Sequence, residues 1–266
     1  MRIVCWNMRR ASRNSPAWDH FIDLAPDLAL LQEVGSMPRP VQELYSVNGL
    51  KAVTKSGRLQ RFGTFILARE AEVTPFHLES EVDWVDEQLR HFAGNLVASR
   101  VRFSGTAFSV VSVYSPAWPL PREVWSGIDV STIKLDLNPD IWVTELLWAA
   151  IKDRKIQDGW IVGGDLNSSE TFDYMWSGGP RGNKQILDRM DAGGFTEVLR
   201  HSQGQLTPTF RNPRGGRIVH QMDHLFVSND FLPRLQSCVV GDASQVFDFS
   251  LSDHLPIVAD FAPDRL

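Results

Sequence analysis

Residues 159–167 read GWIVGGDLN, an apolar run followed directly by polar residues. The run from Trp160 to Val162 is rich in β-forming residues, which predicts a buried strand. Asp165 and Asn167 come at its end, where a Gly-Gly-Asp turn would also account for them. The rest of the chain decides between a turn and a site, because a site needs partners from other strand ends.

Seven further short apolar runs predict strands, at 2–6, 28–32, 63–68, 95–103, 107–114, 221–228 and 257–261. Helix-like segments lie between some of them, at 15–24, 139–155 and 184–194. Strands and helices mixed along the whole length, without a repeat or a linker, predict one α/β domain over residues 1–266. Residues 115–140 are the least regular part, and we expect them to form a long surface excursion beside the site.

Polar side chains end or begin several of the predicted strands, and strand ends in α/β proteins converge on one rim of a sheet. Each of these residues has an ordinary structural explanation on its own, such as a turn, a solvated strand end or a half-buried aromatic ring. The pattern as a whole indicates a functional site. Its members are Asn7, Glu33, Tyr114, Asp165, Asn167, Asp223, Asp253 and His254.

Composition limits the classes of function. Of the 266 residues, 43% are hydrophobic and 22% are charged, and the net charge is −5 with a pI near 5.8. This acidity argues against a protein that coats nucleic acid through bulk charge, but not against a metal-dependent nuclease, whose site is itself acidic. Cys5 and Cys238 form neither a zinc motif nor a disulfide framework. No signal peptide or membrane span is predicted, which favours a cytoplasmic protein.

Seven short motifs together resemble the endonuclease/exonuclease/phosphatase superfamily, the DNase I-like group that includes exonuclease III-type enzymes. They are CWN, LQE, VYSP, GGDLN, TPTF, MDHLFVS and SDHLP, and they run from residue 5 to residue 256. The resemblance implies an α/β (α+β) fold: a DNase I-like four-layer α/β/β/α sandwich, with the site at the rim between two packed sheets.

The resemblance also implies a phosphoric ester hydrolase that depends on Mg²⁺ or Mn²⁺, ions that take hard oxygen ligands. Glu33 would be the principal metal ligand and Asn7 would support it. Asp253 would complete the metal site or bind a second ion.

The same resemblance assigns the catalytic roles. Asp165 would accept the proton of the attacking water, and Asn167 would bind the phosphate or hold Asp165 in place. His254 would donate to a phosphate oxygen or share the acid–base work, with Asp223 fixing its tautomer. Which of Asp165 and His254 is the base stays open.

Some positions depart from the exonuclease III pattern. Tyr114 matches those enzymes, but Ala117 stands where they usually carry Asn, and His220 stands where repair enzymes place Trp. Abasic-site specificity is therefore in doubt. The signature of inositol polyphosphate 5-phosphatases is also missing around Asp223.

Basic residues flank the predicted site on two sides. Arg9 lies beside Asn7, and a loop carries Thr209, Arg211, Arg214 and Arg217. These residues are candidates for substrate binding, although a solvated basic loop remains an alternative. Phe172, Tyr174 and Trp176 would either stack on bases or pack.

Three classes of function remain. The first is hydrolysis of nucleic acid phosphodiester bonds by a DNA endonuclease or exonuclease, acting as a monomer. The second is a phosphatase or phosphodiesterase for a small phosphorylated metabolite, nucleotide or lipid headgroup. The third, a catalytically silent binding module, is disfavoured because all the predicted catalytic residues are present.

Overall fold

The computed structural model describes residues 1–103, 105–152, 159–175 and 179–262, and two six-stranded sheets form its centre. The first sheet has the order β13-β14-β1-β2-β4-β3, in which β1 is parallel to β2 and antiparallel to β14. Its strands are β1 (Arg2–Ala11), β2 (Leu28–Val34), β3 (Tyr45–Val53), β4 (Leu59–Arg69), β13 (Leu235–Val240) and β14 (Ile257–Phe261).

The second sheet has the order β5-β6-β7-β8-β12-β9, with β7 parallel to β8 and β12 antiparallel to β8. Its strands are β5 (Glu72–Phe76), β6 (Leu96–Phe103), β7 (Thr106–Tyr114), β8 (Trp160–Asp165), β9 (Phe195–Glu197) and β12 (Asp223–Ser228). A separate hairpin is formed by β10 (Phe210–Arg211) and β11 (Ile218–His220).

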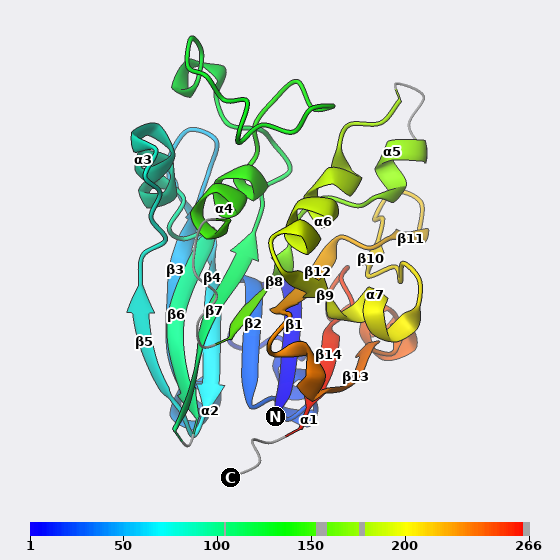
Figure 1. The fold of residues 1–266 in the computed structure, drawn as a ribbon. Coiled ribbons are helices and arrows are strands. Elements are labelled where there is room, and N and C mark those ends of the chain that lie inside the picture. Colours follow the sequence, from blue (N-terminus) through cyan, green and yellow to red (C-terminus); the bar gives the residue numbers. More distant parts are fainter. Residues whose placement is uncertain (104, 153–158, 176–178, 263–266) are drawn as a thin grey trace.

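Helices cover the outer faces of both sheets (Figure 1). Helix α1 (Ala17–Asp23) packs on the first sheet, whereas α3 (Asp83–His91), α4 (Val143–Ile151) and α6 (Asn183–Ala192) pack on the second. The remaining elements are α2 (Arg39–Leu44), α5 (Thr171–Met175), α7 (Val198–Gln203) and the short turns η1 (Arg122–Val124), η2 (Leu232–Arg234) and η3 (Ser244–Asp248). The predicted four-layer sandwich is confirmed.

The inner faces of the two sheets share one apolar core. Ile3 and Leu30 from the first sheet lie in the same buried cluster as Val110, Ile161 and Leu225 from the second. Burial of such side chains contributes about 1.5–3 kcal/mol each, so this layer fixes how the sheets face each other.

The segment between β7 and α4, residues 115–142, contains the predicted excursion at 115–140 and extends beyond α4 at the top of Figure 1. The excursion was predicted to lie on the surface, but Leu120 and Ile133 are buried in the cluster under α4 and α6, and Leu135 is buried as well. The excursion thus contributes side chains to the core as well as to the surface. Among the described residues, no helix is long and apolar enough to cross a membrane.

Candidate active site

Three neighbouring strands of the second sheet carry one row of polar side chains. Tyr114 on β7 pairs with Asp165 on β8, and Asp165 pairs with Asp223 on β12. Cross-strand partners project from the same face of a sheet, so the pairing register alone brings these residues together. Gly164 permits the close approach of β7, because a Cβ there would lie 1.8 Å from the carbonyl oxygen of Val113.

Asp165 is held from both sheets. Its Oδ2 accepts a hydrogen bond from Asn7 Nδ2 at 2.9 Å, across the gap between the sheets. Its Oδ1 accepts one from the backbone N–H of Asn167 at 2.8 Å, and the Asn167 side chain donates to the carbonyl of Ser115 at 2.6 Å. The carboxyl group of Asp165 therefore has one fixed orientation, and its side chain is only 2% exposed.

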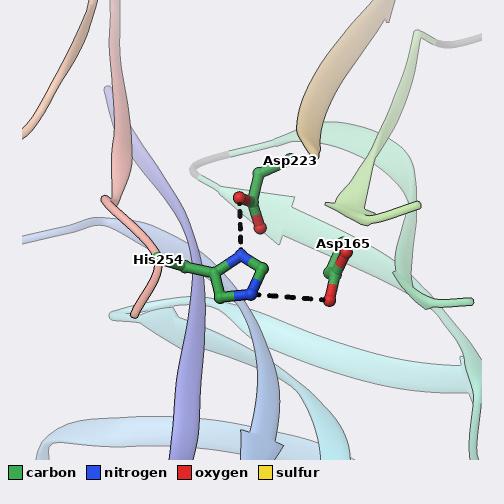
Figure 2. Close-up of side chains that lie close together, drawn as sticks. All are labelled: Asp165, Asp223 and His254. Carbon is green, nitrogen blue, oxygen red and sulfur yellow. Dashed lines mark hydrogen bonds and ion pairs between the residues drawn. The ribbon is translucent and has the colours of Figure 1, made fainter. Parts of the chain in front are cut away.

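His254 lies between two aspartates (Figure 2). Its Nδ1 is 2.8 Å from Asp223 Oδ2, and its Nε2 is 4.0 Å from Asp165 Oδ2. Asp223 is fully buried and also accepts a hydrogen bond from the Thr209 hydroxyl at 2.6 Å. The ring of Phe210 lies 4.8 Å from the imidazole, centre to centre, and limits its movement.

Electrostatics favour a protonated imidazole at this place. Burial alone would lower the pKa of His254, but the carboxylates of Asp223 and Asp165 raise it to about 10. Burial raises the pKa of Asp165 to about 7, against the opposing effect of His254. These carboxylates thus favour the protonated imidazole, and in that state Nδ1 donates to Asp223.

A second group of charged residues lies on the other side of the site. Arg10 Nε is 3.5 Å from Glu33 Oε2, and Arg9 Nε is 3.7 Å from Asp253 Oδ2. Burial, together with the nearby carboxylates of Glu33 and Asp165, raises the pKa of the Tyr114 phenol. These carboxylates keep partial solvent contact, at 17% for Glu33 and 22% for Asp253.

The charged residues of this second group lie on irregular backbone. The register between β1 and β2 shifts between Asn7 and Ala11, as at a β-bulge. Arg9, Arg10 and Glu33 there have φ values of 46°, 60° and 51°, in the left-handed region, and Asn167 across the site has 46°. Such conformations cost about 1–3 kcal/mol each and persist where the surrounding structure enforces them, which is common at functional sites.

The two groups border one cavity of about 410 Å³. Eight predicted or neighbouring residues of the site lie in its wall: Arg9, Arg10, Glu33, Tyr114, Asp165, Asn167, Asp253 and His254. Asn7 and Asp223 stand behind the wall and support Asp165 and His254.

The predicted substrate residues beyond Arg9 do not reach this wall. Thr209 is fully buried and holds Asp223, so its side chain cannot contact a substrate. Arg211 lies over the ring of Phe247, 5.4 Å from its centre, and Arg214 and Arg217 are exposed around the β10–β11 turn. Of the predicted stacking residues, Phe172 packs on His220, Tyr174 is exposed, and Trp176 lies outside the described residues.

Two supporting residues were missed as site residues. Ser252 accepts a hydrogen bond from the His254 backbone N–H and donates to the Asn7 carbonyl, which joins β1 to the SDH segment. Phe62 lies under the Arg10 guanidinium at 5.3 Å and against Tyr114. The position of Ser252 in the SDH motif could have identified it as a site residue, but nothing in the sequence around Phe62 indicates that it lies at the site.

The donor set of the site suits a divalent cation. Asp165, Asp223 and His254 offer ligand atoms within 4.8 Å of one another, and Glu33 and Asp253 add carboxylates at the cavity wall. Asn7 Oδ1 accepts the Arg9 backbone N–H at 3.0 Å and keeps one further lone pair. Because the nearby arginines can swing away from the carboxylates they pair with, a hard oxygen site is available without breaking the fold.

Comparisons with solved structures give the same fold. An AP endonuclease from Archaeoglobus fulgidus matches 98% of this chain and 99% of its own, with 19% identity and a TM-score of 0.67. A 3'-5' exonuclease from Neisseria meningitidis matches 99% and 100%, with 19% identity and a TM-score of 0.67. The endonuclease domain of TRAS1, a telomere-specific non-LTR retrotransposon, matches 99% of each chain, with 16% identity and a TM-score of 0.63.

A search of curated protein sequences finds no match. A model of one protein family does match, over residues 4–254. That range contains every residue that lines the cavity of about 410 Å³. The chain belongs to the endonuclease/exonuclease/phosphatase family.

Proposed function

We propose that this protein is a divalent-metal-dependent phosphodiesterase that hydrolyses nucleic acid, as a DNA endonuclease or exonuclease. One observation carries the proposal: the Asp223–His254 pair faces Asp165 across 4.0 Å, at the wall of a cavity that also holds Glu33. Hydrolysis of a phosphodiester needs a proton acceptor for water, a donor for the phosphate and charge stabilisation, and this wall offers all three.

His254 and Asp165 divide the proton work in this proposal. With Nδ1 bound to Asp223, His254 directs an N–H from Nε2 into the cavity and donates to a phosphate oxygen. Asp165, oriented by Asn7 and Asn167, accepts the proton of the attacking water. His254 Nε2 and Asp165 Oδ2 are 4.0 Å apart, which is too far for a direct hydrogen bond. In this proposal, the reacting oxygens of water and phosphate lie next to this gap, within reach of the two groups.

Glu33, with Asn7 and Asp253, would hold Mg²⁺ or Mn²⁺. The ion would supply charge stabilisation on the phosphate oxygens. We prefer these oxygen ligands to the Asp165–Asp223–His254 cluster, because Nδ1 of His254 is already bonded to Asp223 and Mg²⁺ favours oxygen. Arg9 and Arg10 would bind phosphate once their carboxylate partners turn to the ion.

Nucleic acid is the proposed substrate because the similar structures come from proteins described as an AP endonuclease and a 3'-5' exonuclease. A 3' phosphatase from Neisseria bound to a product DNA hairpin is also similar, at 18% identity and a TM-score of 0.66. The family description itself includes phosphatases, so a small phosphorylated compound is the second candidate. A single catalytic domain over 1–266, a monomeric state and a cytoplasmic location remain predictions.

The test is nicking of supercoiled plasmid DNA by the purified protein with Mg²⁺ or Mn²⁺, beside an EDTA control. We expect metal-dependent nicking that falls by about 10²-fold or more in Asp165→Asn. Asp188→Asn is the matched control, because Asp188 is exposed and, among the described residues, its ion-pair partner is Lys184 on α6. A folded protein that does not nick DNA but releases phosphate from small compounds would favour the second candidate.

A further inference from the structure

A buried hydrogen bond joins the two sheets at the residue before Glu33. The side-chain amide of Gln32 on β2 donates from Nε2 to the Ser112 hydroxyl on β7 at 3.0 Å. Both residues are fully buried, and neither belongs to the cavity wall. The proposed chemistry uses neither side chain, so the role of this bond has to be found in what it holds in place.

Glu33 lies in a β-bulge of β2. In the pairing of β2 with β4, the register shifts between Leu31 and Val34. Two residues of β2, Gln32 and Glu33, therefore lie opposite one residue of β4. A bulge changes the direction of the side chain that it inserts, and bulges are common beside active sites. Glu33 has a φ of 51° there, and its side chain lines the catalytic cavity.

A left-handed conformation is costly for a glutamate, so contacts on both sides of Glu33 have to enforce it. On the C-terminal side, the backbone N–H of Gly35 donates to the carbonyl oxygen of Ala11 at 2.9 Å. On the N-terminal side, the regular pairing of β2 with β1 ends at Gln32. The Gln32 Oε1 has no hydrogen-bond partner among the described residues, so the bond from Nε2 to Ser112 is what orients this amide.

Ser112 connects this anchor to the row of polar side chains on the second sheet. Ser112 and Tyr114 are two positions apart on β7, so their side chains project from the same face of the sheet. Tyr114 in turn pairs with Asp165 on β8. The bond between Gln32 and Ser112 thus ties the strand that carries Glu33 to the strands that carry the row containing Asp165.

We propose that Gln32 is the positioning residue of Glu33, because its hydrogen bond to Ser112 holds the bulge that presents the Glu33 carboxylate to a divalent cation. The inference rests on the proposed function, which assigns Glu33 to the metal. Gln32 is fully buried outside the cavity wall, so it touches neither the cation nor the substrate. Loss of the bond should therefore weaken metal binding and leave the rate of the metal-loaded protein nearly unchanged.

The experiment measures binding of Mn²⁺ to the whole protein without DNA, from the electron paramagnetic resonance signal of the free ion. Ser112→Ala removes only the hydroxyl, and Gln32→Met keeps the length of the side chain without its amide. Each variant should weaken Mn²⁺ binding about fivefold to tenfold, as expected for one buried hydrogen bond. The double variant should bind no more weakly than the weaker single variant, because both substitutions remove the same bond. Ser112→Ala is the milder change and carries the test if Gln32→Met does not fold.

Ser99→Ala is the matched control. Ser99 on β6 is also fully buried, and its hydroxyl accepts a hydrogen bond from the Asn48 amide on β3 at 2.8 Å, again between the two sheets. Neither residue lies in the cavity wall. Ser99→Ala should lower the thermal stability about as much as Ser112→Ala does, but it should leave the affinity for Mn²⁺ unchanged. An equal loss of Mn²⁺ affinity in both variants would overturn the inference, because general stability would then explain it.

The positioning role and the proposed function fail in different ways. Metal-dependent nicking by the wild type, with unchanged Mn²⁺ affinity in folded Ser112→Ala, would overturn the positioning role alone. Weaker Mn²⁺ binding in Ser112→Ala but not in Ser99→Ala, in a protein that does not nick DNA, would support the positioning role and move the substrate to a small phosphorylated compound. A wild-type protein that binds no Mn²⁺ would overturn both.

Discussion

The two sides of the catalytic cavity are built differently. On the acid–base side, Asp165, Asp223 and His254 are almost fully buried and lie in or beside regular strands, with hydrogen bonds of 2.8–2.9 Å. On the metal side, Glu33 and Asp253 keep solvent contact and pair with exposed arginines at 3.5 and 3.7 Å.

The contrast shows which side of the cavity has its geometry fixed in advance. Burial makes the acid–base side costly to rearrange and fixes its geometry before a substrate arrives. Loose ion pairs between exposed groups contribute about 0–1 kcal/mol, so the metal side can exchange its arginine partners for a cation at little cost. Variants on the two sides should therefore fail in different ways.

The largest effect is expected on the acid–base side. His254→Ala should lower the turnover rate by about 10²-fold or more, and Asp223→Asn should lower it less. Because Asp223 acts through His254, the double variant should be no slower than His254→Ala alone. Rates of nicking for the four proteins test this, and additive losses would mean that Asp223 has a separate role.

Glu145 on α4 is a buried carboxyl that lies outside the cavity wall. The pKa of Glu145 is raised by burial from 4.5 to about 7, so between these pH values the folded chain keeps a proton that the unfolded chain has lost. The stability of the wild-type protein therefore falls as pH rises through this window, by about 3 kcal/mol in total. Glu145→Gln does not titrate and should gain that amount relative to wild type between pH 4.5 and 8.

Urea unfolding of both proteins at the two pH values measures this difference. The relative stability has to be compared across pH, because the substitution also changes hydrogen bonds at every pH. Two stability curves that stay parallel from pH 4.5 to 8 would show that Glu145 is ionised with an ordinary pKa.

On the metal side, Glu33→Gln should raise the Mg²⁺ concentration at half-maximal activity by about tenfold, as expected when a charged ligand becomes neutral. Arg10→Ala should lower that concentration, because it removes the competing partner of Glu33. The two Mg²⁺ titrations should shift in opposite directions from wild type. Shifts in the same direction would place the ion elsewhere.

The smallest effect is expected at the rim. Arg217 is exposed at the β10–β11 turn and outside the cavity wall, so Arg217→Ala should raise KM about two- to fivefold and leave kcat nearly unchanged. The effect should shrink at high salt, as for a phosphate contact. A loss in kcat would bring this loop into the catalytic step.

Much of the fold was predictable from the sequence because its central strands are long apolar runs. The edge strands were missed: β3 has no clear alternation of buried and exposed residues, and β5 contains Pro75, which usually argues against a strand. Helix α3 was also missed, although acidic residues in its first turn and Arg90 and His91 in its last are ordinary helix signals.

The strand-end pattern predicted which residues meet at the cavity wall, but it did not predict their hydrogen-bond and stacking partners. The contact of Asn7 with Asp165 joins residues 158 positions apart, and the Arg10–Phe62 contact depends on a bulge that no residue type announces. The predicted substrate residues were placed least well. The sequence around Thr209 and Arg211 does not indicate whether their side chains face a ligand or contact the protein, as both do here. The pocket of about 270 Å³ beside the cavity was not predicted, because residues 115–142, α4 and α6 all contribute to its walls and are separate in the sequence.

The adjacent positions of Tyr114, Asp165 and Asp223 depend on the pairing register of β7, β8 and β12. Inserting one residue within β8 would turn Asp165 to the opposite face and separate it from both neighbours. The connection from β7 to β8 has no such constraint, although it carries the excursion and α4. A change of length in that connection would leave the pairing of Tyr114, Asp165 and Asp223 in register.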